Sequence, residues 1–395
     1  MTEGSGEPQG GAPVHRGPLE GLVVADFSRV LAGPFATMLL GDLGADVVKV
    51  EHPGGGDETR AWGPPFAHGH STYYLAVNRN KRSVALDLGD EHGRRAARAL
   101  AGRADVLVEN FKAGSMERLG LGYEQLARDN PGLVWCSISG FGRGAGAALP
   151  GYDFLVQAMS GLMSITGPDR GEPTKVGVAL VDVLTGLYAF GGVLAALRER
   201  DRSGRGQRVE VSLLGSALAS LVNQASSYLC TGRPPRAMGN RHPSITPYET
   251  LATADRPLVV AVGNDGQFAR LCRVLGTPEA AADPRFTTNA ARVANRDALA
   301  ALLEGALAAR GAAEWVADLS EAGVACGLVN DVGEAFALAE RLGLDPVVHA
   351  GEVPQVADPI SLSDTPVGYR LAPPALGQHT AEVLRWLGVP PPGDP

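Results

Sequence analysis

Short apolar runs and amphipathic segments alternate along the first half of the chain. "LVVADF" (22–27) is an apolar run, "GPFATMLLGDLG" (33–44) has helical spacing, and "DVVKVE" (46–51) is apolar again. A strand–helix–strand unit of this length predicts two parallel strands joined by a helix. The alternation continues to "QRVEVSLL" (207–214). The pattern therefore predicts an α/β fold, a large Rossmann-like domain with a mostly parallel sheet covered on both faces.

The predicted strands after this first unit are "SVALDL" (83–88), "DVLVENF" (105–111) and "LVWCSISGF" (133–141), and one helix is predicted over 115–130. In parallel sheets, ligands bind beyond the carboxyl ends of the strands. The loops "SRVLAGP" (28–34), "NFKAG" (110–114) and "SGFG" (139–142) follow three of the strands. We expect these loops to surround a ligand site.

The longest apolar stretch, "VGVALVDVLTGLYAFGGVLAAL" (176–197), contains one charged residue, Asp182. It predicts a strand or loop that leads into a buried helix rather than a membrane span. A carboxylate alone in apolar surroundings costs several kcal/mol unless it is paired, hydrogen-bonded or protonated. Asp182 fits either of two roles: a helix N-cap, or a positioned nucleophile or base that the helix dipole helps to keep ionised.

The pattern changes in the second half of the chain. The Pro/Gly/Arg-rich segment "TGRPPRAMGNRHPS" (231–244) ends the first pattern, and an Ala-rich helical region spans about 290–322. A chain of 395 residues is too long for one ordinary core. The predicted organisation is a disordered tail (1–17), the large domain (18–225), a linker with a smaller α/β domain (226–335), and a C-terminal segment (336–395) that ends with a short amphipathic helix.

Composition and motifs exclude several function classes. A net charge of −8 argues against general nucleic-acid binding. The four cysteines are far apart and the histidines lack metal-ligand spacing, which predicts a cytoplasmic protein without a metal site. The chain contains no G-x-G-x-x-G, no G-x-x-x-x-G-K-[ST] and no G-x-S-x-G sequence. Dehydrogenase, P-loop and serine-hydrolase hypotheses therefore lack their motifs.

Several blocks together resemble the family III CoA-transferases, also called the CaiB/BaiF family. They include "DFSRVLAGPFATMLLGDLGADVVKVEHPGGGDETRAWGPPF" (26–66), "DVLVENFKAGSMERLGLGY" (105–123), "GVALVDVLTGLYA" (177–189) and "MGNRHPSITPYE" (238–249). The blocks occur in the family's order along nearly the whole chain after residue 18. The resemblance implies an acyl-CoA:carboxylate CoA-transferase that forms an interlocked homodimer, without a membrane or nucleic-acid partner. It also implies that the C-terminal segment (336–395) is a return segment that completes the large domain.

The resemblance also implies site residues. It places the family's catalytic carboxylate on Asp182, which would form a mixed anhydride with the acyl group and then a thioester with CoA. No tightly bound cofactor is implied, because the CoA thioester is itself the substrate. The residues that the resemblance places around CoA are Leu31, Ala32, His52, Leu86 to Gly89, Asn110, Phe111 and Arg118, with Arg29, Arg79 and Arg82 as further candidates.

The substrates and two alternative functions stay open. Leu31 stands where oxalate-specific relatives have Gln, and the block from Ser28 to Phe66 is closer to the succinyl-CoA:dicarboxylate branch. Arg60 or Arg241 could bind a distal carboxylate. An α-methylacyl-CoA racemase of the same fold would carry His where this chain has Tyr152. A non-catalytic CoA-binding protein is the other alternative.

Overall fold

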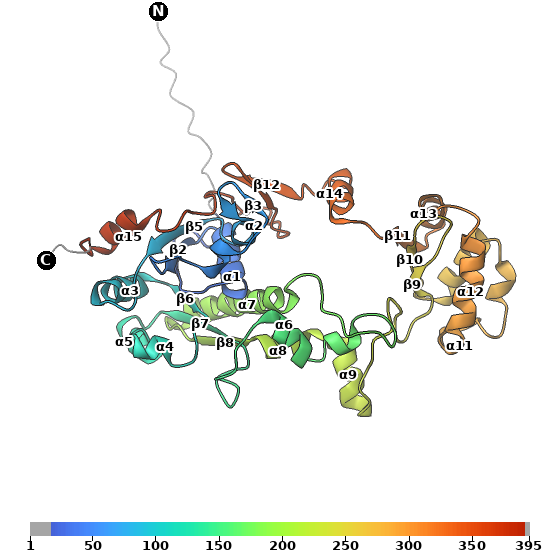
Figure 1. The fold of residues 1–395 in the computed structure, drawn as a ribbon, viewed down its shortest axis with the longest axis horizontal. Helices are drawn as coiled ribbons and strands as arrows, with labels where there is room; N and C mark the ends of the chain where they lie inside the picture. Colours follow the sequence, from blue (N-terminus) through green and yellow to red (C-terminus); the bar gives the residue numbers. More distant parts are fainter. Residues whose placement is uncertain (1–16, 392–395) are drawn as a thin grey trace, which may run out of the picture. The chain divides into compact units, whose positions relative to one another are not determined.

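A six-stranded parallel sheet forms the centre of the first of two structural units. The computed structural model describes residues 17–391, so the predicted tail lies outside the described residues except for Gly17. The strand order is β5–β2–β1–β6–β7–β8, and each neighbouring pair is parallel. The strands are β1 (Val23–Asp26), β2 (Asp46–Glu51), β5 (Lys81–Ala85), β6 (Val106–Glu109), β7 (Val134–Ser139) and β8 (Arg208–Ser212). The predicted α/β fold with a parallel sheet is confirmed (Figure 1).

Helices cover both faces of this sheet. One layer contains α1 (Ala32–Asp42) and α7 (Leu180–Ser203), and the other contains α3 (Glu91–Arg103), α5 (Tyr123–Asp129) and α15 (Thr380–Leu387). The core under the second layer joins Phe27 and Leu107 of the sheet region to Leu100 of α3 and Leu384 of α15. The C-terminal segment therefore completes the core of this unit, as the resemblance implies.

The single helix predicted over 115–130 is wrong. The chain forms α4 (Ser115–Arg118) and α5 (Tyr123–Asp129), separated by a turn at Gly120. Gly120 has φ of 71°, a left-handed conformation that breaks the helical hydrogen-bond pattern. Amphipathic spacing on both sides of the turn made the two helices look continuous.

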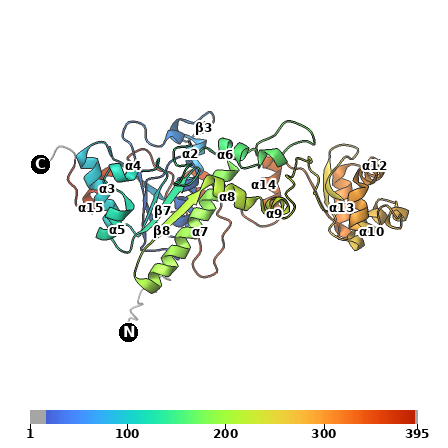
Figure 2. The same cartoon turned by 90° about the horizontal axis from the view of Figure 1, so that it is seen from below.

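Helix α7 is long and apolar enough for a membrane span by length and composition alone. Its inner face, which includes Val181, Ala189 and Val193, is buried. It packs against α1, β7 and β8, and Figure 2 shows it running beside β7 and β8. These contacts account for the apolar stretch as a core helix. The predicted loop that leads into a buried helix is confirmed, but the helix begins at Leu180 and includes Asp182, which was predicted to precede it.

Shorter elements complete the first unit. They are η1 (Glu58–Ala61), β3 (Phe66–Ala67), β4 (His70–Ser71), α2 (Thr72–Leu75), α6 (Asp153–Met159), α8 (Leu213–Ser220), β12 (Val347–Ala350) and β13 (Val353–Val356). Helix α9 (Val222–Thr231) spans the boundary between the units.

The second unit comprises residues 161–176 and 227–344. Its antiparallel sheet has the order β11 (Ala325–Leu328), β10 (Leu258–Ala261), β9 (Tyr248–Leu251). Its helices are η2 (Met163–Ile165), α10 (Asp265–Val274), η3 (Pro278–Ala281), α11 (Asn289–Ala294), α12 (Arg296–Leu307), α13 (Ala312–Glu321) and α14 (Val332–Arg341). Phe268, Phe286, Leu303 and Trp315 belong to its separate core.

The predicted helical region over about 290–322 is confirmed. It consists of three helices, because the backbone leaves the helical conformation at Asn295 and Gly311. The bounds of the two units differ from the sequence prediction. Residues 161–176 pack with the second unit, and the chain returns to the first unit at residue 345 rather than 336. The predicted return point falls inside α14, whose helical pattern does not indicate which unit it joins.

Candidate active site

A pocket of about 280 Å³ lies at the carboxyl edge of the parallel sheet. The loops that follow β1, β6 and β7 line it, together with the first turn of α7. The strand order reverses between β1 and β6, and this reversal is where open α/β sheets bind their ligands. The prediction that residues 28–34, 110–114 and 139–142 surround one site is confirmed for the pocket they line.

Asp182 is the carboxylate that the helix α7 presents to this pocket. It is the third residue of the helix, it lines the pocket, and it is only 9% exposed. Leu31 and Ala32, at the start of α1, line the same pocket. Helices α1 and α7 pack together closely enough that a Cβ at Gly186 would lie 2.7 Å from the Ala32 carbonyl oxygen. This close approach brings the start of α1 and the Asp182 turn together.

The N-cap interpretation of Asp182 is wrong. The N-cap position is Ala179, and it has no side-chain cap. Asp153 of α6 takes the capping role instead, because its Oδ1 accepts hydrogen bonds from the backbone N–H groups of Val181 (2.8 Å) and Asp182 (3.3 Å). Gln157 holds the other Asp153 oxygen at 2.7 Å. Capping by a second helix leaves the Asp182 carboxylate free to face the pocket.

The surroundings of Asp182 raise the pKa of its carboxyl group. Burial, followed by the neighbouring charge of Asp153, raises the pKa of Asp182 from 3.8 to about 7. Within residues 17–391, no side chain donates a hydrogen bond that would stabilise its charged form. Desolvation therefore outweighs the stabilisation of the ionised carboxylate that was expected from the helix dipole. At neutral pH the carboxyl group is divided between both forms, which suits a reactive carboxylate.

Four of the residues assigned to CoA line the Asp182 pocket. Leu31 and Ala32 contribute its apolar side, and Asn110 and Phe111 belong to the loop after β6. Asn110 has a structural task as well: its Oδ1 accepts from the Arg29 backbone N–H (3.0 Å), and its Nδ2 donates to the Arg29 carbonyl (2.8 Å). The Arg29 guanidinium lies over the Phe111 ring at 5.4 Å. Arg29 is therefore a charged residue of the pocket lining whose position is held by Asn110 and Phe111.

The other CoA candidates lie outside this pocket. His52 follows β2, is largely exposed, and has its Nε2 3.9 Å from the Asp87 carboxylate. Gly89 follows β5, in the turn where its N–H donates to Asp87. The Leu86 side chain is buried in the core, so only its backbone is available to a ligand. Arg118 of α4 donates to the Ser115 hydroxyl at 2.8 Å.

Three arginines are committed to ion pairs. Arg79 is buried against Asp42, and Arg82 pairs with Asp46 and Glu382. Neither lines the pocket. Arg60 pairs with Glu51, and its guanidinium lies 3.9 Å from the Tyr74 ring centre. The structure therefore gives these three arginines structural partners rather than a place beside Asp182.

Sequence reasoning missed two residues near Asp182. Asp153 supplies the negative charge and the helix cap, and Tyr73 packs with Leu31, Ala179 and Val183 in one apolar cluster. Burial, then the charge of Asp182, raises the pKa of Tyr73 to about 12, so its hydroxyl keeps its proton. The aspartate directly after Tyr152 was a possible signal, but nothing in the sequence pairs it with a residue 29 positions away.

Comparisons with known proteins show the family to which the chain belongs. The model of "CoA-transferase family III" matches residues 19–380. Succinate–glutarate CoA-transferase of Agrobacterium fabrum is 45% identical over 95% of this chain and 97% of its own length. Acetyl-CoA:oxalate CoA-transferase of Acetobacter aceti is 42% identical over 95% of this chain and 97% of its own. The crystal structure of a CaiB/BaiF family protein from Brucella suis has a TM-score of 0.86 and 44% identity, covering 94% of this chain and all of the other.

Proposed function

The chain belongs to the family III CoA-transferases and transfers CoA between an acyl-CoA and a carboxylate, and on this premise we propose that it moves CoA from succinyl-CoA to a dicarboxylate such as glutarate, with Asp182 as nucleophile. The observation that supports the nucleophile is the buried Asp182 carboxylate at the pocket, without a side-chain hydrogen-bond donor among the described residues. A carboxylate that serves only the fold would have partners.

The reaction proceeds in four balanced exchanges at Asp182. One Asp182 oxygen attacks the thioester carbonyl and the C–S bond breaks. CoA thiolate departs, and the acyl group is then joined to Asp182 as a mixed anhydride. The thiolate then attacks the Asp182 carbonyl carbon and releases the donor acid. The acceptor carboxylate attacks the resulting aspartyl-CoA thioester and forms a second anhydride, from which the thiolate takes the new acyl group. The Asp182 carboxylate is restored, and these steps need no metal because the thioester supplies the activated acyl group.

The apolar surroundings of Asp182 serve this route. Two of its intermediates are anhydrides, and water in the pocket would hydrolyse them. Leu31, Ala32 and the buried face of α7 keep the side of the pocket next to Asp182 apolar. The same desolvation raises the pKa of the Asp182 carboxyl group. Burial of Asp182 therefore both excludes water and makes its carboxyl group a weaker acid.

The residues proposed to contact CoA are spread along the edge of the sheet. His52 and Gly89 follow β2 and β5, while Asn110 follows β6, three strands from β5. Neighbouring strands lie about 4.8 Å apart, so this edge extends over about 14 Å. We propose that the nucleotide lies near His52 and the Leu86–Gly89 turn, and that the pantetheine passes Asn110 and Phe111 towards Asp182, with Arg118 near the phosphates.

The acceptor is proposed from similarity and from one pocket residue. The relatives include transferases named for glutarate and for oxalate at 45% and 42% identity, so identity alone does not separate the two acids. Leu31 places an apolar side chain beside Asp182, which favours an acceptor with a methylene chain over oxalate. Arg60 and Arg241 are engaged with Glu51 and with Glu249 and Asp297, so the group that binds the distal carboxylate stays open.

We further propose that the enzyme is a cytoplasmic homodimer. Large apolar side chains are exposed on α6 and α7 of the single chain, among them Phe154, Met159, Leu187 and Tyr188. A second copy would cover such a surface. All four cysteines are free, which supports a reducing compartment. Sedimentation-equilibrium measurements of the purified protein should give twice the chain mass, and a monomer at micromolar concentration contradicts the dimer.

The first experiment is a transfer screen followed by mass spectrometry. Purified protein is mixed with succinyl-CoA, acetyl-CoA or formyl-CoA and with glutarate, oxalate and other carboxylic acids. We expect glutaryl-CoA from succinyl-CoA and glutarate. Asp182→Ala should abolish transfer while CoA still binds, whereas Asp129→Ala, at an exposed carboxylate, should not change the rate. Normal turnover of Asp182→Ala would falsify the proposed nucleophile.

A further inference from the structure

The loop between β1 and α1 contains a strained residue next to the active-site pocket. Val30 has φ of 71°, in the left-handed region that β-branched residues rarely adopt. The next two residues, Leu31 and Ala32, line the Asp182 pocket and begin α1. A residue keeps such a conformation only where the surrounding structure holds it. Neighbouring groups must therefore hold the Val30 backbone in this conformation.

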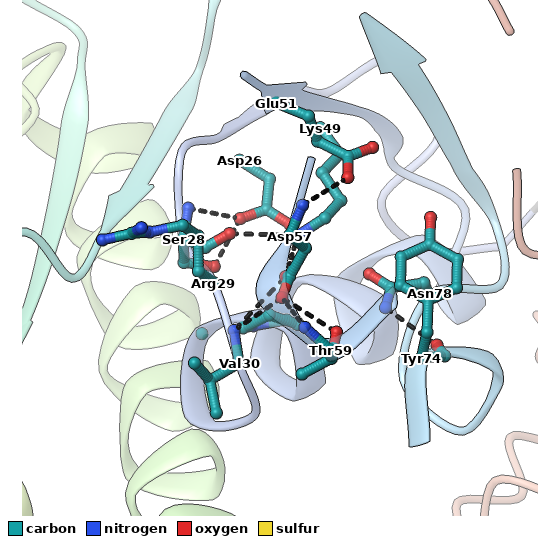
Figure 3. A network of polar contacts seen from close by, with 12 residues as sticks. Asp26, Ser28, Arg29, Val30, Lys49, Glu51, Asp57, Thr59, Tyr74 and Asn78 are labelled. Atoms are coloured by element: carbon teal, nitrogen blue, oxygen red, sulfur yellow. Dashed lines mark hydrogen bonds and ion pairs between the residues drawn. The ribbon is translucent and has the colours of Figure 1, made fainter. Parts of the chain in front are cut away.

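A buried carboxylate binds the Val30 backbone. Asp57 accepts a hydrogen bond from the Val30 N–H at 3.2 Å, and it also accepts from the backbone and hydroxyl of Thr59 at 3.0 and 2.8 Å. Lys49 donates to Asp57 at 2.9 Å and to the Ser28 carbonyl at 3.0 Å. Figure 3 shows Asp57 between Lys49, Val30 and Thr59. One ion pair thus holds the loop backbone at two points, two residues apart.

The side chains of this pair have no solvent-exposed surface. Both are 0% exposed. Burial raises the pKa of Asp57, but the charge and hydrogen bond of Lys49 together with the hydrogen bonds from Thr59 outweigh burial and hold the pKa below its usual range. Burial lowers the pKa of Lys49, but Asp57 and then Asp26 reverse the effect and raise it. The pair is therefore charged at neutral pH.

Its energetic cost argues that the pair has a task other than stability. Replacing a buried ion pair by apolar side chains is often neutral or stabilising, because desolvation of two charges offsets their attraction. A second buried pair, Asp26–Lys81, lies at the same end of β1 and holds the Ser28 N–H at 2.9 Å. Both pairs thus bind the loop that leads into the pocket.

We propose that Lys49 and Asp57 are positioning residues for catalysis: they hold Val30 in its left-handed conformation and so orient Leu31 and Ala32 against Asp182. This inference rests on the proposed function. If Val30 relaxed to negative φ, the peptide that follows it would turn, and the start of α1 would no longer face the nucleophile in the same way. Neither residue lines the pocket, so we expect their effect to reach the reaction through the backbone segments that they hold.

The test compares two equally buried carboxylates: Asp57, near the start of α1, and Asp42, at the end of α1. In Asp57→Asn, the four donors that meet the carboxylate oxygens face one oxygen and one NH₂ group. An NH₂ group in place of Oδ2 would face the Lys49 ammonium and the Val30 N–H, which are both donors. The matched control is Asp42→Asn, which breaks the buried Asp42–Arg79 pair at the other end of α1. An α-helix of this length separates the two sites by about 15 Å.

We expect Asp57→Asn to lower kcat for CoA transfer about 10- to 100-fold, the typical effect of misplacing reacting groups by about 1 Å. The KM for the acyl-CoA should change by less than about threefold, because most CoA contacts lie elsewhere on the sheet edge. Asp42→Asn should lower the melting temperature similarly and leave kcat unchanged. Amides of residues 31 and 32 should exchange hydrogen faster in folded Asp57→Asn than in Asp42→Asn.

A second substitution separates geometry from charge. Glycine adopts positive φ without the cost that valine carries. Val30→Gly in the Asp57→Asn background should therefore recover kcat by about fivefold, although it restores no charge. If Asp57→Asn does not fold, Thr59→Ala removes a single donor to the carboxylate and should lower kcat in the same direction by a few-fold.

Three results overturn the inference while transfer by the wild-type protein stands. They are full kcat in folded Asp57→Asn, equal losses of kcat in Asp57→Asn and Asp42→Asn, and no recovery with Val30→Gly. Absence of transfer by the wild-type protein with every donor and acceptor defeats the proposed function instead. In that case the hydrogen-exchange comparison still decides whether Asp57 holds the loop.

Discussion

Asp182→Asn should make the protein inactive and more stable at the same time. The pKa of the Asp182 carboxyl is about 7 in the fold against an ordinary value of 3.8, and each unit corresponds to about 1.4 kcal/mol. The three-unit difference means that ionised Asp182 destabilises the fold by about 4 kcal/mol at pH 8. Asparagine has nearly the same shape and no charge to desolvate. The variant should therefore recover most of this free energy.

The sign of the pH dependence follows from the raised pKa. The folded protein holds a proton on Asp182 that the unfolded chain releases near pH 4, so the favourable contribution is complete below pH 4 and is lost as the pH rises to about 7. The stability difference between Asp182→Asn and wild type should grow by about 1.4 kcal/mol per pH unit between pH 5 and 7 and level off above it.

Differential scanning calorimetry at one protein concentration measures this difference. For a unit of this size, 1 kcal/mol shifts the melting temperature by about 2–4 °C, so Asp182→Asn should melt about 10 °C above wild type at pH 8. Asp129→Asn, at an exposed carboxylate, should melt within about 2 °C of wild type. A melting temperature of Asp182→Asn that is lower than wild type, or equal to it at every pH, refutes the argument that Asp182 carries an uncompensated buried charge.

Three further outcomes test the site. Asp153→Asn keeps an acceptor for the α7 N–H groups but removes the negative charge beside Asp182. The acid limb of the kcat/KM profile, expected near pH 7 in the wild-type protein, should therefore move to lower pH. An unchanged limb would assign the raised pKa of Asp182 to burial alone. Arg29→Ala should raise the KM for succinyl-CoA about tenfold with kcat nearly constant, the loss of one charge-assisted contact, and an unchanged KM removes Arg29 from the CoA site. Leu31→Gln adds an amide at the pocket and should raise the rate with oxalate relative to glutarate about fivefold, the effect of one neutral hydrogen bond. Mass spectrometry of the products from an oxalate–glutarate mixture measures this ratio. An unchanged ratio excludes Leu31 as a determinant of acceptor specificity.

The fold of the first unit could be predicted because its signals are local. Apolar runs bounded by turns mark β1, β2, β6, β7 and β8 within a few residues, and parallel sheets place the following loops at one edge. Turns inside amphipathic stretches carry weaker signals. The predicted helix over 115–130 contains the positive φ of Gly120, and a glycine at helical spacing does not indicate its own backbone conformation.

Some residues of the candidate site could likewise be predicted from the sequence, and others could not. Asp182 stands out in the sequence because it is the one charge in a 22-residue apolar stretch. Its partner Asp153 does not stand out, because the contact depends on how α6 packs against the start of α7. Arg79 and Arg82 show the converse: the sequence offers them as anion-binding candidates, and tertiary ion pairs with Asp42 and Asp46 use them. Pairings across tens of residues decide which charges are available, and periodicity carries no information about them.

The properties of Asp182 follow from one compromise. A fully solvated carboxylate would be ionised at every physiological pH, but water near it would hydrolyse the proposed anhydrides. A fully buried carboxylate would exclude water, but its pKa would rise several units and little nucleophile would remain. Near neutral pH, a pKa of about 7 keeps about half of the group ionised, while Leu31 and Ala32 contribute apolar side chains to the same pocket. The fraction of nucleophile lost by desolvation is about twofold, whereas water exclusion protects each of two anhydrides per turnover. On these magnitudes burial is the favourable choice, and the apolar composition of α7 is as much a part of the site as Asp182 itself.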